Sequence, residues 1–228
     1  MHELKAELQI KYHTITDFSS HVRKLVSPYS SYAKNIGFEN VNKPNERVLL
    51  RFPDENYIIS VDWNHIAVAV SGKTKDLDKY EGKLRFMYDL IEDIRELDTF
   101  EGIEFSVFRT WDLLPNIHSD ADSFRETFFT ESVPSLSNTN DCAIVIDGEL
   151  TDSNLSFSTT FGPLDYPRDI ERHNLSIFER SAFDHNNIDC TEGCLINSTL
   201  RSTSTSFDYL EVRKFLEANK RIINSIEE

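Results

Sequence analysis

The sequence predicts an α+β protein, with helices packed on one face of a mostly antiparallel sheet. Three observations predict this class. Residues 77–97 carry apolar side chains at steps of three and four, which is the spacing of one helical face. Residues 47–70 contain three short strand-like segments whose brief connections force neighbours to run antiparallel. The order of segments in the first half of the chain then recurs in the second half.

The predicted helix over residues 77–97 is the centre of this interpretation. Its apolar face consists of Leu77, Tyr80, Leu84, Met87, Ile91 and Ile94. Asp78 and Glu81 can form a capping box, which satisfies free backbone amides at the start of a helix. Charged side chains occupy the other side, so we expect the helix to lie with its apolar face on a sheet.

The first half of the chain supplies the strands of that sheet. Residues 4–12 alternate apolar and polar side chains, which predicts a half-buried strand. Residues 18–26 predict a short helix that Pro28 ends, because proline disrupts a helix interior. Residues 29–46 are polar and predict a loop. The three strands that follow are expected at residues 47–52, 57–63 and 66–70.

The second half is expected to follow the same order. Its strands are predicted at residues 103–110, 142–146, 155–161 and 191–203, and its helices at residues 118–129 and from Asp208, which is capped with Glu211. The apolar run at residues 142–146 indicates a buried strand, which turns back either at residues 147–149 or at residues 150–154. Residues 163–190 predict an irregular excursion.

The last helix can be aligned with the helix over residues 77–97 at one constant offset. Tyr209, Val212, Leu216, Ile223 and Ile226 then match Leu77, Tyr80, Leu84, Ile91 and Ile94. We therefore expect two pseudo-repeated β/α halves, residues 1–100 and 101–228, packed as one compact unit. Each half has the order strand, helix, three strands, helix. If the halves pair edge to edge, the second face of the sheet offers a broad binding surface.

Composition narrows the function classes. With 39 acidic and 24 basic residues the net charge is −15, which disfavours direct binding to nucleic acid or to an anionic membrane. It favours a protein partner, basic or encoded by a neighbouring gene, and leaves open whether the chain is a homo-oligomer. No apolar run approaches the roughly 18–20 residues of a membrane span. Charges throughout residues 1–13 exclude a signal sequence, and three cysteines favour a reduced, cytoplasmic protein.

Two sets of residues are candidate metal ligands. They are His185, Cys190 and Cys194, and His118, Asp120 and Asp122. The first set is looser than the tight cysteine pairs of structural zinc sites and lacks a fourth ligand. In the second set, Asp120 as a helix cap is the simpler account. We assign no cofactor, and no catalytic residue, because no glycine-rich phosphate loop and no HExxH or GxSxG motif occurs.

A third group of residues is expected to contact a partner. Arg168, Arg172 and His173 lie in the irregular excursion, and long loops often carry binding residues. Trp63 and Trp111 each end a predicted strand. Core packing is the default role of tryptophan, yet tryptophan is also favoured as an interface anchor.

Several segments together carry a resemblance that covers nearly the whole chain. They are LKAELQIKY, RVLLRFPDENYIISVDWNHIAVAV, IEFSVFRTWDLLP and the closing strand and helix. In this order the chain resembles a sporadically distributed family of uncharacterised bacterial proteins. The family brings no activity and no catalytic residue with it. Its patchy distribution implies mobile or defence-associated genes.

The expected function is that of a non-enzymatic protein-interaction subunit, within an antiviral defence or toxin–antitoxin assembly that the resemblance implies. Two alternatives stay open. An acidic inhibitor, immunity protein or nucleic-acid mimic would use the net charge of −15. A metal-dependent hydrolase or nuclease would use one of the two candidate ligand sets.

Overall fold

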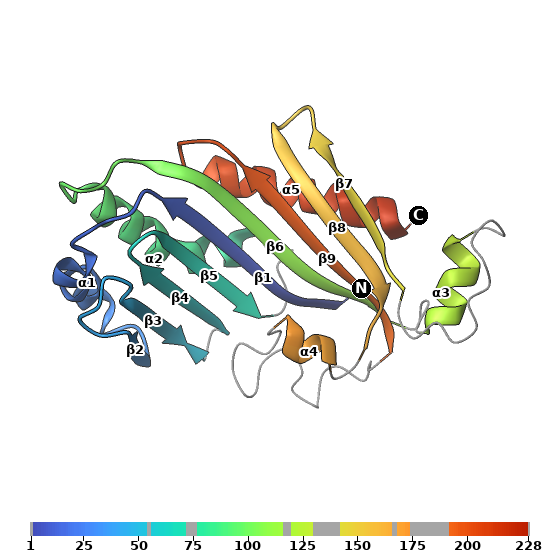
Figure 1. The fold of residues 1–228 in the computed structure, drawn as a ribbon, viewed down its shortest axis with the longest axis horizontal. Helices are drawn as coiled ribbons and strands as arrows, with labels where there is room; N and C mark the ends of the chain where they lie inside the picture. Colours follow the sequence, from blue (N-terminus) through green and yellow to red (C-terminus); the bar gives the residue numbers. More distant parts are fainter. Residues whose placement is uncertain are drawn as a thin grey trace.

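The computed structural model describes residues 2–53, 56–71, 77–115, 120–129, 142–165, 168–173 and 192–227. These residues form one antiparallel sheet of nine strands in the order β2-β3-β4-β5-β1-β6-β9-β8-β7, with helices beside it (Figure 1), which confirms the α+β class. The strands are β1 (His2–Tyr12), β2 (Asn35–Glu39), β3 (Arg47–Phe52), β4 (Tyr57–Asp62), β5 (His65–Ser71), β6 (Ile103–Pro115), β7 (Ile144–Leu150), β8 (Leu155–Pro163) and β9 (Gly193–Ser202). The helices are α1 (Phe18–Val26), the 3₁₀ turn η1 (Ser27–Tyr29), α2 (Leu77–Arg95), α3 (Ala121–Phe128), α4 (Arg168–Arg172) and α5 (Tyr209–Glu227).

The centre of the sheet is the pair β1–β6. β1 pairs with β5 on one side and with β6 on the other, and β6 continues to β9, all in antiparallel register. In each half, therefore, the opening strand pairs with the last strand of the meander that follows it. The two halves share one continuous sheet because their opening strands pair with each other.

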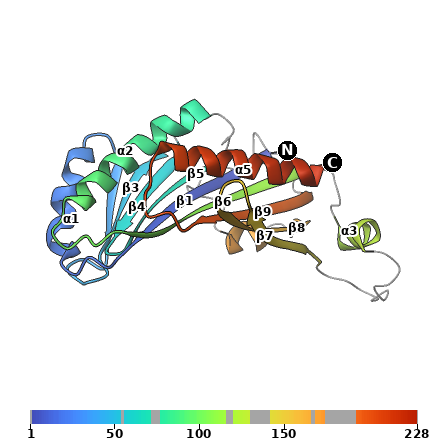
Figure 2. The same ribbon diagram turned by 90° about the horizontal axis from the view of Figure 1, so that it is seen from above.

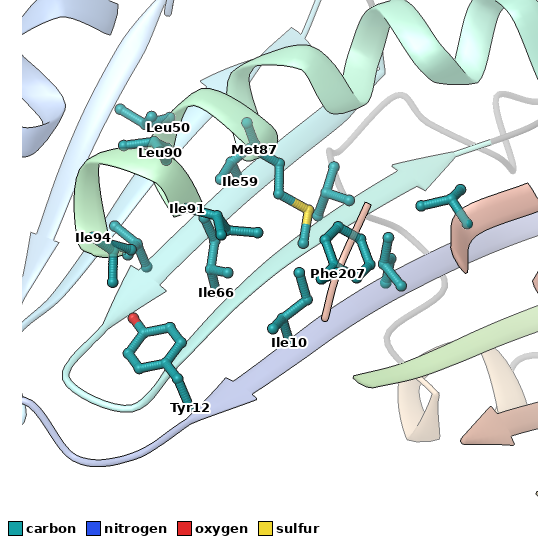
Figure 3. Packing of buried hydrophobic residues seen from close by; sticks show 14 of the residues in the cluster. Ile10, Tyr12, Leu50, Ile59, Ile66, Met87, Leu90, Ile91, Ile94 and Phe207 are labelled. Carbon is teal, nitrogen blue, oxygen red and sulfur yellow. The ribbon is translucent and has the colours of Figure 1, made fainter. Parts of the chain in front are cut away.

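Three helices cover one face of this sheet. Figure 2 shows α1, α2 and α5 on the same side of the strands. Met87, Ile91 and Ile94 of α2 are at most 3% exposed and point toward the strands that Figure 3 labels with Ile10 and Ile66. Burying this apolar face stabilises the fold by about 1.5–3 kcal/mol for each large side chain. The helix over residues 77–97 is confirmed, while the side chains of Leu77, Asp78, Tyr80, Glu81 and Leu84 lie outside the described residues.

Helix α5 packs over the second half of the sheet. Phe215 is fully buried and its ring stacks on Phe108 of β6, with centroids 5.9 Å apart. Asn219, also buried, accepts a hydrogen bond of 3.0 Å from the Thr110 hydroxyl. Asp208 accepts from the Glu211 amide at 3.0 Å, so the predicted cap is present. Leu216, which we expected on the buried face, is only partly buried.

Two predictions about local structure are wrong. Within the predicted loop 29–46, residues 35–39 form the edge strand β2, because their backbone pairs with β3 despite a polar sequence. Of the apolar run at 142–146, residues 144–146 begin β7, an edge strand on which Val145 and Ile146 are 58% and 44% exposed, so the strand is not buried as predicted. Residues 147–149 continue that strand, and residues 150–154 make the reversal.

The helices do not all lie on one face. Leu164, just before α4, packs with Trp111 and Leu195, and the register of β6 places Trp111 on the side away from α5. The His173 ring, directly after α4, lies 6.3 Å from the Trp111 ring. The prediction of helices on one face therefore holds for α1, α2 and α5, and residues around α4 cover one end of the other face.

Candidate interaction face

The face of the sheet opposite α1, α2 and α5 is here named the open face. Because side chains alternate along a strand, the cross-strand register determines which residues lie on it. On the six central strands they are Arg47, Leu49 and Arg51 of β3; Ile58, Ser60 and Asp62 of β4; His65, Ala67 and Ala69 of β5; Lys5, Glu7, Gln9 and Lys11 of β1; Phe105, Val107, Arg109 and Trp111 of β6; and Asn197, Thr199 and Arg201 of β9. On the outer strands they are Asn35, Gly37 and Glu39 of β2; Ser156, Ser158 and Thr160 of β8; and Val145, Asp147 and Glu149 of β7.

A hollow of about 300 Å³ lies on the open face over β3, β4, β5 and β1. It is lined by Lys5, Glu7, Gln9, Arg47, Leu49, Ile58, Ser60, His65, Ala67 and Ala69. Ser60 lies opposite Ala67, and Ala69 follows two residues later on the same face. These small side chains leave space between longer neighbours, although alanine is depleted in strands. The floor of the hollow is therefore a property of β4 and β5, and its polar wall comes from β1 and β3.

A buried carboxylate, that of Asp62, holds two of the residues that line the hollow, His65 and Arg47. Asp62 accepts hydrogen bonds of 3.0 Å from the Asn64 and His65 amides, and its Oδ1 lies 2.9 Å from His65 Nδ1. Burial by itself raises the pKa of Asp62, but the hydrogen bonds from His65 and Asn64 outweigh it and hold that pKa below its usual value. His65 Nε2 lies 3.2 Å from Arg47 Nη2. Asp62 thus fixes the imidazole and, with it, the position of Arg47.

Glu7 connects two cations at the other side of the hollow. Its carboxylate lies 3.4 Å from Lys5 Nζ and 3.3 Å from Arg109 Nη1. Lys5 is only 5% exposed, and its ammonium lies 4.8 Å above the centre of the Trp111 ring. A buried ammonium needs such partners, because desolvation of an unpaired charge is costly. Lys5 is therefore part of the packing of this face, whereas Arg109 lies nearer to solvent.

The centre of the open face is basic although the chain is acidic. On the six central strands, β3 to β9 in the sheet order, six lysines and arginines and two acidic residues lie on this face. The edge strands β2 and β7 add the acidic residues Glu39, Asp147 and Glu149. Lys11, Arg51 and Arg201 form no ion pair with any residue that the structure describes. The Arg201 guanidinium instead lies 4.1 Å above the centre of the Phe105 ring.

The residues expected to contact a partner separate into three places. Trp63 packs against the main core and its carbonyl accepts from the Ile15 amide at 2.8 Å. Trp111 and His173 come together beneath the covered end of the open face, where burial lowers the pKa of His173. Arg168 and Arg172 are exposed, and Arg168 pairs with Asp165 at 2.8 Å.

Neither candidate metal set assembles among the described residues. Asp120 caps α3 by accepting from the Ser123 amide at 2.8 Å, and Asp122 lies 3.4 Å from Arg125. Cys194 is buried, and burial raises the pKa of its thiol to about 11. His118, His185 and Cys190 lie outside the described residues. Over the part of the chain that is described, no three His, Cys, Asp or Glu side chains gather as metal ligands would.

Comparison with known proteins adds no family. No protein-family model matches the sequence, and no curated protein matches it either. None of the helices in the described ranges combines the length and the apolar character that crossing a membrane requires.

The hollow on the open face was not predicted from the sequence. The signal was present in the alternation of β4 and β5, where Ser60, Ala67 and Ala69 occupy positions on the solvent-facing side. Small side chains at these positions contribute little to packing or to solubility, so they indicate that this surface has another role, such as contact with a partner. The basic charge of the face could not be read in the same way, because Arg109 and Arg201 join it only through the pairing of β6 and β9.

Proposed function

We propose that this protein is a non-enzymatic interaction subunit that binds a protein partner on the open face of its sheet. The observation that supports this proposal is the asymmetry of the two faces. One face is covered by α1, α2 and α5, whereas the other is hollowed over its first half and carries half-exposed polar side chains. A broad sheet face with a shallow hollow is suited to a macromolecular surface.

The polar groups of the hollow are arranged for structure and contact. His65 is held between Asp62 and Arg47, which occupies both ring nitrogens. Ser60 makes no hydrogen bond to His65 within the described part of the chain, so these residues do not form the nucleophile and base pair of a hydrolase. The geometry therefore supports recognition in preference to catalysis.

The expected repeat extends this proposal to the origin of the surface, although β2 gives the first half a fourth strand between α1 and α2, and α4 lies between β8 and β9 in the second half. We propose that the two halves, residues 1–100 and 101–228, derive from one ancestral β/α unit. The equivalent pairings β1–β5 and β6–β9 support it. A duplicated unit joined through its opening strands gives a sheet twice as wide, and with it a larger face for a partner.

The resemblance to a sporadically distributed bacterial family is the basis for a proposal about the partner and the pathway. We propose that the partner is the product of a neighbouring gene, and that the assembly serves antiviral defence or is a toxin–antitoxin pair. Co-purification of a neighbouring gene product from the native host supports this, and its absence under conditions that retain other complexes contradicts it.

An affinity capture from the native host tests the interaction itself. The tagged wild-type chain is compared with Ala67→Tyr, which fills the hollow at a half-exposed strand position where an aromatic side chain is favoured. The control is Leu210→Tyr, which adds a tyrosine at a 61% exposed position of α5 on the opposite side. We expect Ala67→Tyr to lose the captured partner and Leu210→Tyr to retain it. Equal capture by both variants would refute the proposed face.

A further inference from the structure

We infer that the open face binds an acidic polypeptide segment, whose carboxylates contact the arginine and lysine side chains around the hollow. This inference rests on the proposed function, because it names the chemistry of the partner that covers the same face. It also revises the expectation of a basic partner. That expectation followed from the net charge of −15, whereas the charge of one face decides what that face binds.

The charge at the centre of the open face is opposite to that of the whole chain. Acidic residues outnumber basic ones by 39 to 24 in the sequence. On the six central strands of the open face the proportion reverses, with Lys5, Lys11, Arg47, Arg51, Arg109 and Arg201 against Glu7 and Asp62. The acidic residues Glu39, Asp147 and Glu149 lie at its two edges, on β2 and β7. A local excess of positive charge attracts an anionic partner surface and repels a basic one, even on a protein whose net charge is negative.

Some of these cations are available to a ligand without rearrangement. Arg51 and Arg201 form no ion pair with a described residue. The Arg201 guanidinium stacks on Phe105, and a stacked guanidinium keeps its in-plane N–H donors for a carboxylate. Glu7 already holds Lys5 and Arg109, so it competes with an incoming carboxylate.

The spacing of the cations sets the size of the ligand. Arg51 and Arg109 end one cross-strand row that runs through Ile58, Ala69 and Glu7. Four strand spacings separate them, which is about 19 Å at ~4.8 Å per spacing. An extended chain covers this distance with about six residues. A ten-residue acidic peptide is therefore long enough to reach cations on both sides of the hollow.

A polypeptide fits this face better than a nucleic acid does. Proteins that bind single strands on a sheet face stack bases on exposed aromatic rings. On the described open face, Phe105 is covered by Arg201, and Trp111 is only 6% exposed beneath Lys5. A phosphate polymer longer than the face would also meet the acidic remainder of the chain.

Binding of a fluorescein-labelled deca-glutamate peptide to the full chain, followed by anisotropy in low salt, tests this inference. We expect saturable binding that weakens steeply as salt rises. The double variant R51E/R201E should weaken binding by about tenfold or more, because two charge pairs are replaced by repulsion. Glu7→Gln should strengthen binding by up to about fivefold, because it removes a competing carboxylate and releases Arg109. The control R213E/K220E makes the same change in net charge at two exposed positions of α5 and should alter affinity by less than about twofold.

The outcomes separate this inference from the proposed function. Tighter binding of a labelled ten-nucleotide oligothymidylate than of deca-glutamate would overturn the acidic polypeptide, as would equal weakening by R51E/R201E and R213E/K220E. So would salt-sensitive self-association without peptide binding, since the occupant would then be a second copy. If the peptide fails to bind while Ala67→Tyr still abolishes capture of the native partner, the open face is an interaction surface and only its proposed charge preference is wrong.

Discussion

Replacing Phe215 by alanine tests directly whether α5 is packed on the sheet. The Phe215 side chain is fully buried, and its ring stacks on Phe108 at 5.9 Å. Removal of the ring loses about 1.5–3 kcal/mol of hydrophobic transfer free energy. It also loses about 0.5–1.5 kcal/mol from the aromatic pair. The expected decrease in the free energy of unfolding is therefore about 2–4.5 kcal/mol, which overlaps the about 3–5 kcal/mol seen for phenylalanine truncations in cores.

The higher helix propensity of alanine opposes this loss of stability, which makes the result easier to interpret. Alanine is a better helix former than phenylalanine, so any destabilisation must come from packing. The matched control is Leu210→Ala on the same helix, where the leucine is 61% exposed. We expect that control to change stability by less than about 0.5 kcal/mol.

Urea unfolding at 25 °C, followed by far-ultraviolet circular dichroism, measures both variants. The denaturant slope should stay constant, since the native sheet is retained. A loss below about 1 kcal/mol for Phe215→Ala, or a loss equal to that of Leu210→Ala, would refute the packing of α5 over β6.

Three further substitutions test single interactions. Asp62→Asn should lower the free energy of unfolding by about 2 kcal/mol at pH 7. Because the pKa of Asp62 is lowered on folding, this difference from wild type should be complete above pH ~4 and should shrink as pH falls through the folded-state pKa. Urea unfolding curves between pH ~3 and ~7 measure it. Asp208→Ala removes the cap of α5 and should cost about 1 kcal/mol in the same urea assay, with no change if the bond to the Glu211 amide is absent. Gly193→Ala should lower the free energy of unfolding by about 2 kcal/mol or more, because φ is +155° and the new Cβ would meet the Leu114 carbonyl. Gly102→Ala, where φ is +133° and the space around the new Cβ is open, should cost less. A lower melting temperature for Gly102→Ala than for Gly193→Ala would contradict this.

Periodicity predicted most of the elements, because it depends only on neighbouring side chains. The steps of three and four that end in Met87, Ile91 and Ile94 predict α2, and these three side chains are buried. The short connections after residues 52 and 63 predict antiparallel neighbours, and β3, β4 and β5 pair in that way. Where periodicity was weak, as in residues 35–39, the backbone still found a partner in β3 and formed β2.

The candidate site could not be predicted in the same way. From the sequence, Asp120 and Cys194 are candidate metal ligands. In the structure Asp120 caps α3 and Cys194 is buried. Nothing in the sequence indicates that Arg47 and Arg109 lie on one face. The proximity of such residues arises from strand order, and the sequence separation between them gives no sign of it.

The amino-acid sequence by itself determined the α+β class, the positions of the two long helices and the antiparallel meander, since each follows from local spacing. The tertiary structure decided which strands lie side by side, that β7 is an exposed edge, and that residues around α4 cover part of the second face. It also decided that an acidic chain presents basic side chains on the central strands of one face. Net charge is a sum over residues, but the potential at a surface depends on which of those residues folding brings together.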